Sequence, residues 1–315
     1  MTRVLVTGAS GLIGRHCLPI LLARGHEVHA LSRRRLSPMD CPDVIWHEMD
    51  LLQPGRAAEL IREARPDSLL HLAWYAVTGK FWESPENFDW VRASLELLRE
   101  FSGNGGTRIV FAGSCAEYGL SSGECIEDAT PLLPTGLYGQ SKRDLELAVR
   151  ASTRQSGLSS AWGRVFFLYG PHEHPDRPVA YVVRSLLKGQ PAACSEGTQI
   201  LDFLHVEDVA SALVALLESR VHGPVNIGSG NPVSLRAVFE TIGRQLARSE
   251  LIQFGAREAG SQPYRVWANT QKLVREVGWA PRYTLATGIE QTIEWWRGSA
   301  KISESDHVPQ AGETI

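Results

Sequence analysis

The first 170 residues alternate short apolar runs with longer amphipathic stretches. Residues 4–7 are apolar and stop at Gly8, residues 12–23 repeat apolar side chains at helical spacing, and residues 26–31 predict a second strand. Further strands are expected at 44–49, 67–73, 108–112 and 161–170, with a helix over about 85–101. Strands that alternate with helices in this way predict an α/β fold built on a Rossmann-type, doubly wound parallel sheet.

The alternation loosens after residue 170. Helices are expected at 179–189, 207–219, 235–248 and 285–296, and strands at 199–205 and 224–227. We therefore predict a dinucleotide-binding Rossmann domain over 1–170, with its sheet completed by parts of 199–230. A smaller mixed α/β lobe over 171–298 is predicted mainly to bind substrate. Residues 299–315 are polar and lack periodicity, which predicts a disordered tail.

The composition narrows the class of protein. The 315 residues carry 32 basic and 35 acidic side chains, a net charge of −3, so no global positive field points to nucleic acid. The five cysteines are scattered without CxxC spacing, which indicates reduced thiols and no metal site. No apolar run reaches the length of about 18 residues that a membrane helix needs, and the first residues do not form a signal peptide. We expect a cytoplasmic protein with no membrane partner.

A glycine-rich turn follows the first predicted strand. Its three glycines have the spacing GxxGxxG and lead directly into a predicted helix. Such glycines let the backbone turn tightly and admit a pyrophosphate to the helix N-terminus. The cofactor-binding residues predicted here are Gly8, Ser10, Gly11, Leu12, Ile13 and Gly14. The alternative is a turn that only packs the helix against the strand.

The ends of the next strands carry further information on the cofactor. The second strand ends at Ser32-Arg33-Arg34 with no acid until residue 40, whereas NAD sites usually place a carboxylate there. Guanidinium groups suit a 2′-phosphate, so NADP(H) is the preferred cofactor and NAD(H) the alternative. The arginines could instead form a solvated loop. Residues after the third and fourth strands are assigned to the same cleft: Asp50, Leu51, Leu72, Ala73 and Trp74.

Tyr138 and Lys142 are the candidate chemical groups. Four residues apart on a helix, they lie on one face, and an ammonium one turn away favours the phenolate. Ser114, after the fifth strand, would hydrogen-bond the same substrate oxygen, and such a set moves a proton on or off a sugar hydroxyl or ketone. Thr135 is the expected helix cap, which places Tyr138 in the first turn. An ordinary surface pair of tyrosine and lysine is the alternative.

Aromatic side chains crowd residues 74–90, where Gly79 and Pro85 interrupt regular structure. A segment of this kind at a cleft can hold a substrate. It can equally cover a helix with apolar side chains. The sequence leaves both interpretations open.

Together these landmarks resemble the extended short-chain dehydrogenase/reductase superfamily, and within it the NAD(P)-dependent epimerase/dehydratase family that acts on nucleotide sugars. The resemblance spans about residues 3–297 and comprises Thr7-Gly8-x-x-Gly11-x-x-Gly14, Asp50-Leu51, His71-Leu72-Ala73, Ser114 with Tyr118-Gly119, Tyr138-x-x-x-Lys142, Arg164 with Tyr169-Gly170-Pro171, and Asp202-Phe203-Leu204-His205-Val206-x-Asp208. It implies that Tyr138 is the acid/base, that Lys142 activates it and also binds the cofactor, and that Ser114 is the catalytic hydroxyl.

The chain departs from the family pattern at several substrate positions. Family dehydratases carry Asp-Glu after the catalytic hydroxyl, where Cys115-Ala116 stand, and Glu117 could replace that pair only if the loop were shifted. The family often has an arginine directly before the Asp-Phe pair, but this chain has Leu201 there. It also often has an asparagine after the sixth strand, where this chain has Phe167-Leu168. The predicted substrate-binding residues are Trp74, Lys80, Cys115, Glu117, Phe167 and Arg265, the last as a replacement guanidinium.

Three functions are therefore weighed. The main prediction is an NADP(H)-dependent oxidoreductase that reduces a keto-sugar, nucleotide-linked by resemblance, with Tyr138 as general acid. The alternative is an NAD-dependent nucleotide-sugar epimerase, and the third possibility is a cofactor-sensing binding protein without turnover. The resemblance also implies a homodimer formed through helices near the catalytic one.

Overall fold

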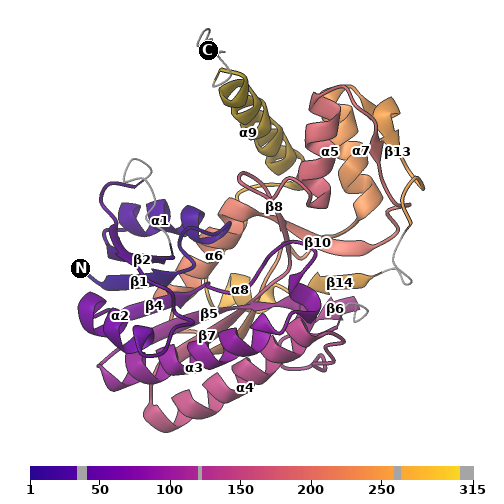
Figure 1. The fold of residues 1–315 in the computed structure, drawn as a ribbon. Coiled ribbons are helices and arrows are strands. Elements are labelled where there is room, and N and C mark those ends of the chain that lie inside the picture. The colour runs from indigo at the N-terminus through magenta and orange to yellow at the C-terminus, as the bar shows by residue number, and fades with distance from the viewer. Residues whose placement is uncertain (34–40, 120–122, 259–263, 306–315) are drawn as a thin grey trace, which may run out of the picture.

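A seven-stranded parallel sheet forms the centre of the molecule (Figure 1). The computed structural model describes residues 1–33, 41–119, 123–258 and 264–305. Within them the sheet has the order β11-β7-β5-β4-β1-β2-β3. Its strands are β1 (Arg3–Thr7), β2 (Glu27–Ser32), β3 (Ile45–Glu48), β4 (Ser68–His71), β5 (Arg108–Ser114), β7 (Ser159–Val165) and β11 (Gly223–Ile227). The sheet reverses its direction of growth after β1–β2–β3, which is the doubly wound topology.

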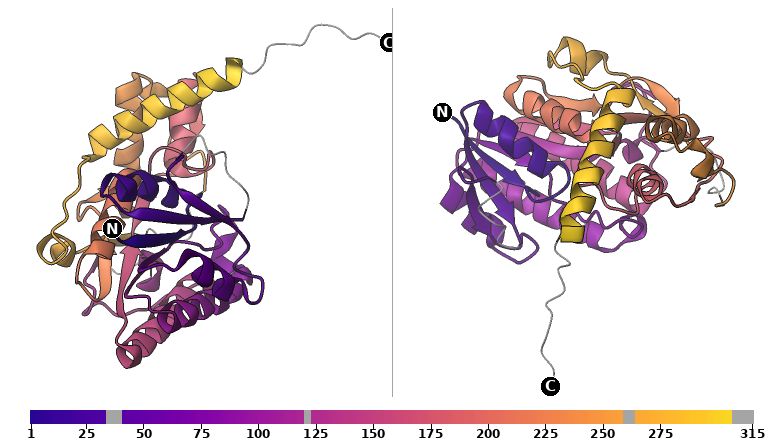
Figure 2. Two further views of the ribbon diagram at one scale, coloured as in Figure 1. Left: turned by 90° about the vertical axis from the view of Figure 1, so that its left-hand side faces the viewer. Right: turned by 90° about the horizontal axis from the view of Figure 1, so that it is seen from above.

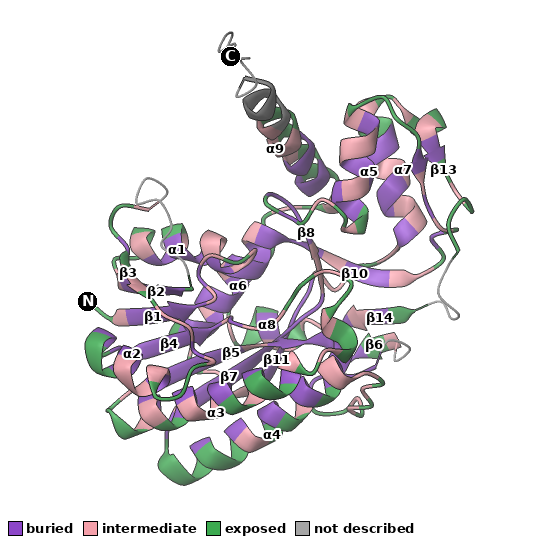
Figure 3. Ribbon diagram, in the orientation of Figure 1, coloured by how far each residue is buried: buried purple, intermediate pink, exposed green. Residues whose placement is uncertain are grey.

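Helices cover both faces of this sheet. One face carries α1 (Gly14–Ala23) and α6 (Val206–Glu218), and the other carries α2 (Arg56–Ala64), α3 (Glu86–Gly103) and α4 (Leu137–Ser156) (Figure 2). Alternate side chains of β1 enter opposite cores, because strand side chains point to alternate faces. Val4 and Val6 pack in the core with α1 and α6, and Leu5 packs in the core with α2 and α3. Figure 3 shows the buried sheet between helices whose outer faces are exposed.

A second, mixed sheet lies beside the first. It has the order β12-β10-β14-β6, and β8 also pairs with β10. The strands are β6 (Gly123–Cys125), β8 (Phe167–Tyr169), β10 (Ile200–His205), β12 (Pro232–Ser234) and β14 (Arg265–Ala268). A third core holds α5 (Pro178–Leu187), α7 (Leu235–Leu246) and α9 (Leu285–Ser305) with the short pair β9 (Ala192–Ala193) and β13 (Ile252–Gln253). The helix α8 (Gln271–Arg275) packs on β11.

The predicted α/β class and parallel sheet are confirmed, but two expectations differ from the structure. The segment 161–170 is two strands, because the chain leaves the first sheet after Val165 and enters the second at Phe167. Within 199–230, β11 lies in the first sheet and β10 pairs in the second. Residues 299–305, expected in a disordered tail, continue α9 through intrahelical bonds, and 306–315 lie outside the described residues.

No helix in the described part of the chain is long and apolar enough to cross a bilayer. All five cysteines are free thiols, and four of them are buried.

Candidate active site

The carboxyl ends of β1, β2, β4 and β5 open into a cavity of about 660 Å³. The glycine-rich turn, Ser32 and Arg33 line one end, and the end of β5 and the start of α4 line the middle. Residues 165–168 and 177–178, from the side of the second sheet, close the other wall. Ligands bind at this edge of open parallel sheets, where the strand order reverses. The cavity is therefore the candidate active site.

The glycine turn is shaped for close approach of a ligand. Gly8 has φ +69°, and a Cβ atom there would lie 2.7 Å from the backbone nitrogen of Ala73. A Cβ at Gly14 would collide with the carbonyl oxygen of Gly8, to which Gly11 N–H also donates at 2.9 Å. Only glycines fit this turn, and they leave its backbone bare to the cavity at the start of α1. The turn fits the pyrophosphate of a dinucleotide.

The end of β2 presents hydroxyl and guanidinium groups to the same cavity. Ser32 Oγ donates to Ser10 Oγ at 3.5 Å, and the exposed Arg33 lines the cavity. Arg34 lies outside the described residues. Asp50 does not line the cavity, because its carboxylate accepts from Leu52 N–H at 3.1 Å and closes its own turn. No carboxylate belongs to the cavity wall in the described part of the chain.

Ser114 and Tyr138 meet in the middle of the cavity. Ser114 ends β5 and caps the short 3₁₀ helix η3 (Cys115–Glu117), where its Oγ accepts from Ala116 N–H at 3.2 Å. Tyr138 lies in the first turn of α4, and the two hydroxyls are hydrogen-bonded. Burial raises the pKa of Tyr138, and the bond from Ser114 lowers it by less. Burial thus opposes the phenolate, which the ammonium of Lys142 is expected to favour.

Lys142 is buried in the wall of the same cavity. Its Nζ donates to the carbonyl of Ala112 at 2.8 Å and lies 3.6 Å from the centre of the Trp74 ring. Burial lowers the pKa of Lys142 to about 7, against the opposing charge of Glu117. A buried lysine with a perturbed pKa in a cavity wall is typical of functional sites.

The aromatic segment 74–90 both lines the cavity and covers α4. Trp74, Phe81 and Trp82 all lie edge-on to Tyr138, with ring centres 6.4, 4.9 and 5.8 Å from it. The same segment caps the catalytic helix, because Glu83 Oε2, in the 3₁₀ turn η2 (Phe81–Glu83), accepts from Leu137 N–H at 3.4 Å. Thr135 is not the cap, since α4 begins one residue later, after an extended Gly136.

The sequence of this chain is similar to those of known enzymes. Residues 4–228 match the model of the NAD dependent epimerase/dehydratase family. The chain belongs to this family. It is 25% identical to a UDP-glucose 4-epimerase of Corynebacterium glutamicum over 97% of this chain and 98% of the relative. The identity to a UDP-glucose 4-epimerase of Azospirillum brasilense is 29%, over 98% of this chain and 95% of the relative.

Solved structures give the same result. MoeE5 in complex with UDP-glucose and NAD has a TM-score of 0.81 to this chain at 30% identity, covering 94% of this chain and 99% of MoeE5. The chain of 315 residues is therefore an enzyme of the extended short-chain dehydrogenase/reductase type, as its own sequence motifs predict.

Glu117 has a different place in this family member from the one expected. It is completely buried and lies outside the cavity wall. Its carboxylate accepts from Ser114 N–H at 2.7 Å, from Trp162 Nε1 at 2.9 Å and from Arg164 Nε at 2.7 Å. With these bonds made, it cannot act on a substrate, and the predicted substrate role is not supported. It instead holds the backbone of Ser114.

Two more of the predicted substrate residues lie away from the cavity. Lys80 and Arg265 are both exposed and do not line it, whereas Trp74, Cys115 and Phe167 do. Arg177, which the sequence analysis did not single out, does line the cavity. It occupies the N-cap position of α5, and its Nε lies 3.1 Å from Oε1 of the buried Glu173. Because it lies well beyond Tyr169, the last residue of β8, no strand end marks it in the sequence.

Proposed function

We propose that this family member is a nucleotide-sugar epimerase that inverts one carbon of the sugar by removing and returning a hydride. The observation that carries the proposal is the convergence of Ser114, Tyr138 and Lys142 on one cavity with the glycine turn. The relatives named UDP-glucose 4-epimerase support it more than they support the keto-sugar reductase of the main sequence prediction. Arg177 supplies the cation that an anionic nucleotide sugar needs in the cavity wall.

Each residue has a definite task in this proposal. A bound nicotinamide cofactor supplies the hydride acceptor. Tyr138 takes the proton of the sugar hydroxyl as the carbon is oxidised and returns it on reduction. Ser114 hydrogen-bonds the same oxygen. Lys142, held by the Ala112 carbonyl, stabilises the phenolate while Tyr138 lacks its proton.

Elimination of water is not part of the proposal. Cys115 and Ala116 occupy the cavity wall where an eliminating enzyme needs an acid and a base, and Glu117 is fully bonded elsewhere. Hydride and proton transfer are the steps that the remaining side chains support.

The keto-sugar reductase is the second candidate, and Arg33 is the observation that favours it. A guanidinium and the Ser32 hydroxyl at the end of β2, with no carboxylate in the described wall, suit the 2′-phosphate of NADP(H). One charge-assisted phosphate contact contributes about 1.5–3 kcal/mol, so we expect NADP(H) to bind at least about tenfold more tightly than NAD(H). Titration of both cofactors measures this, with Arg33→Ala as the variant that should equalise them. Equal affinities in the unmodified protein would remove the argument from Arg33.

One experiment separates the candidates. The purified protein is incubated with UDP-glucose, UDP-glucuronate and nucleotide-linked keto-sugars, and the products are identified by mass spectrometry and NMR. An epimerase interconverts two sugars without net cofactor loss, whereas a reductase consumes one NADPH per two-hydrogen gain. Tight binding of a nucleotide sugar with no product from any member of the panel would favour the cofactor-sensing protein instead.

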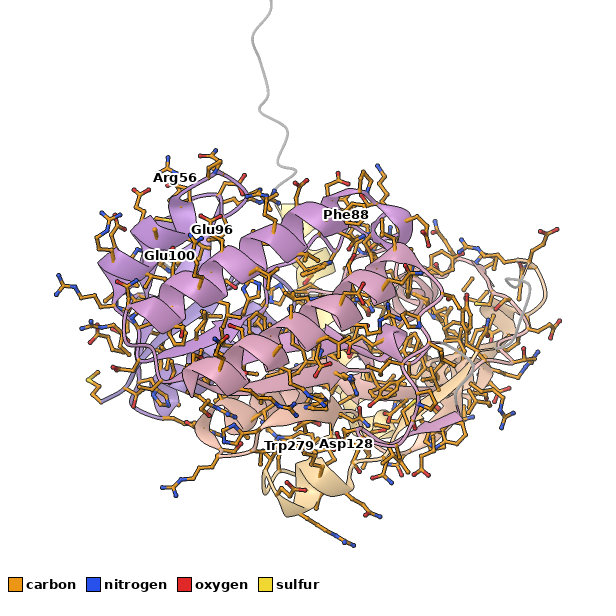
Figure 4. All side chains as sticks on the ribbon, turned by 90° about the horizontal axis from the view of Figure 1, so that it is seen from below. Arg56, Phe88, Glu96, Glu100, Asp128 and Trp279 are labelled. Carbon is orange, nitrogen blue, oxygen red and sulfur yellow. The ribbon has the colours of Figure 1, made fainter. Side chains whose placement is uncertain are left out.

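We also propose that the enzyme forms a homodimer in the cytoplasm. The helices α3 and α4 pack side by side at the surface and carry exposed apolar side chains, Phe88 on α3 and Leu147 on α4 (Figure 4). A second copy would bury them, and the free thiols suit a reducing compartment. Light scattering checks the mass, and Phe88→Glu should shift it towards the monomer.

A further inference from the structure

Lys142 is a buried cation without a carboxylate partner. It is 5% exposed, and it forms no ion pair with any residue that the structure describes. The titratable groups that face it are Glu117 from η3, His71 from β4 and Tyr138 from its own helix. None of them neutralises it at bonding distance. The remaining contacts of Lys142 therefore decide how well its protonated form is stabilised.

The three neighbouring groups are each held by other partners. Glu117 is bonded to Arg164, and Tyr138 to Ser114. His71 accepts from Thr7 Oγ1 at 2.7 Å and bonds Ser94 Oγ at 2.8 Å, while burial lowers its pKa to about 3. His71 is therefore neutral and adds no charge near Lys142. This leaves the Ala112 carbonyl and the face of Trp74 as the direct contacts of the ammonium.

Trp74 is itself fixed by a buried amide. Its Nε1 donates to Asn87 Oδ1 at 2.8 Å, and Asn87 is completely buried in the first turn of α3. Asn87 Nδ2 donates to the carbonyls of Phe81 and Ser84, both at 2.8 Å. The amide therefore joins the indole, the η2 turn and α3 in one network. A buried amide with these bonds made holds a single orientation.

We propose that Trp74 is a positioning residue that holds the Lys142 ammonium against the face of its indole, and that Asn87 fixes the indole for this task. The electron-rich face of tryptophan attracts a cation most strongly where water is excluded. Only the use of Lys142 in turnover rests on the proposed function. The contact itself can be tested without any substrate.

The first test measures Lys142 directly. Competitive acetylation with acetic anhydride across a pH series, read by mass spectrometry, gives the pH at which Lys142 becomes reactive. Trp74→Leu removes the π face, so the protonated form loses support and this midpoint should fall by about one pH unit. Trp74→Phe keeps an aromatic face and should lie between Trp74→Leu and the unmodified protein. An unchanged or raised midpoint in Trp74→Leu would overturn the proposal, because burial alone would then govern Lys142.

The second test leaves the shape of the side chain almost intact. Indoles with one, two and three fluorine atoms, placed at position 74 by codon suppression, weaken the attraction to a cation stepwise. We expect kcat/KM to fall stepwise, by about tenfold across the series. Trp279 is the matched control, since its Nε1 donates to Ser211 Oγ at 2.9 Å on another side of the molecule (Figure 4). If kcat/KM changes no more with fluorination at position 74 than at position 279, the proposal is contradicted.

The Asn87 part has its own variant. Asn87→Leu removes the bonds to the indole and the η2 turn. The acetylation midpoint should therefore fall as it does in Trp74→Leu, and an unchanged midpoint would show that the indole keeps its place without Asn87. If the unmodified protein turns over no nucleotide sugar, the proposed function fails while the acetylation result still decides the role of Trp74.

Discussion

The side chains of Arg164 and Lys142 are two buried cations near Ser114, and their surroundings differ. Arg164 on β7 is 1% exposed and donates to Glu117, to the Tyr118 hydroxyl at 2.8 Å and to the Glu127 carbonyl at 3.2 Å. Lys142 on α4 is almost as buried but has one carbonyl and one ring face. Both contacts of Lys142 leave its charge unneutralised.

The difference is visible in their proton affinities. Burial lowers the pKa of Arg164, but Glu117 and Tyr118 outweigh it and the net pKa is raised. Burial lowers the pKa of Lys142 to about 7 with little opposition. Because Glu117 is bonded to Arg164, it cannot also pair with Lys142. A satisfied buried charge holds the fold, and an unsatisfied one beside it is available for chemistry.

Replacing the functional cation should break turnover and spare the fold. Lys142→Met removes the group that stabilises the phenolate of Tyr138, so kcat should fall by about 10² to 10⁴ with little loss of thermal stability. Tyr138→Phe, which keeps the ring and removes the proton carrier, should give a loss of the same order. Steady-state kinetics and melting curves on both variants check this. Near-normal turnover in either would refute the catalytic assignment.

Replacing the structural cation should have the opposite result. Arg164→Met leaves Glu117 buried without its main partner, and breaking such a pair costs about 3–5 kcal/mol of unfolding free energy. Urea unfolding measures the loss. The double variant Arg164→Met with Glu117→Gln should recover part of it, because the orphaned charge is gone. A double variant that is less stable than the single one would show that the pair acts through packing instead.

The comparison also predicts a pH dependence of stability. The pKa of Lys142 is about 7 when folded and about 10.5 when unfolded, so between these values the unfolded chain binds the extra proton. Unfolding free energy should therefore rise with pH from 7 to 9, by up to about 1.4 kcal/mol per unit from this group. Lys142→Met should flatten the curve in that window. The raised pKa of Tyr138 acts only above this range.

An exposed charge gives the smallest expected effect. Glu83 accepts from Leu137 N–H at the start of α4 but lies in water. Glu83→Gln should cost about 0.5–1 kcal/mol of unfolding free energy, since a helix cap at the surface is screened. Chemical denaturation of the variant, with Glu86→Gln on the neighbouring helix as control, measures it. If Glu83→Gln lowered the unfolding free energy more than Arg164→Met does, the exposed charge would matter more than the buried ion pair and this expectation would be wrong.

The parts of the site that follow from local chemistry could be predicted from the sequence. The glycine turn needs only its own spacing, and Tyr138 with Lys142 needs only the helical period. Partners from distant elements could not be read in this way. The bonds of Glu117 come from residues 45 and 47 positions later, and the cap of α4 comes from 54 positions earlier.

The same limit applies to the fold. The parallel strands were predicted because each is a short apolar run. The strand predicted at 199–205 is present as β10, but the sheet in which it pairs does not follow from its own residues, because pairing partners are set by tertiary packing. Likewise, the sequence alone does not tell which of Arg265 and Arg177 reaches the cavity.

The passage of the chain from β7 to β8 has a mechanical consequence. A single residue, Phe166, separates the last strand position of the first sheet from the first position in the second, and its N–H is bonded to the Ile227 carbonyl at 3.0 Å. A linker this short leaves the two walls of the cavity no hinge between them at this point. In the proposed epimerase we therefore expect little widening of the cavity at this point, so that the volume of the substituents on the sugar ring would limit which substrates are inverted.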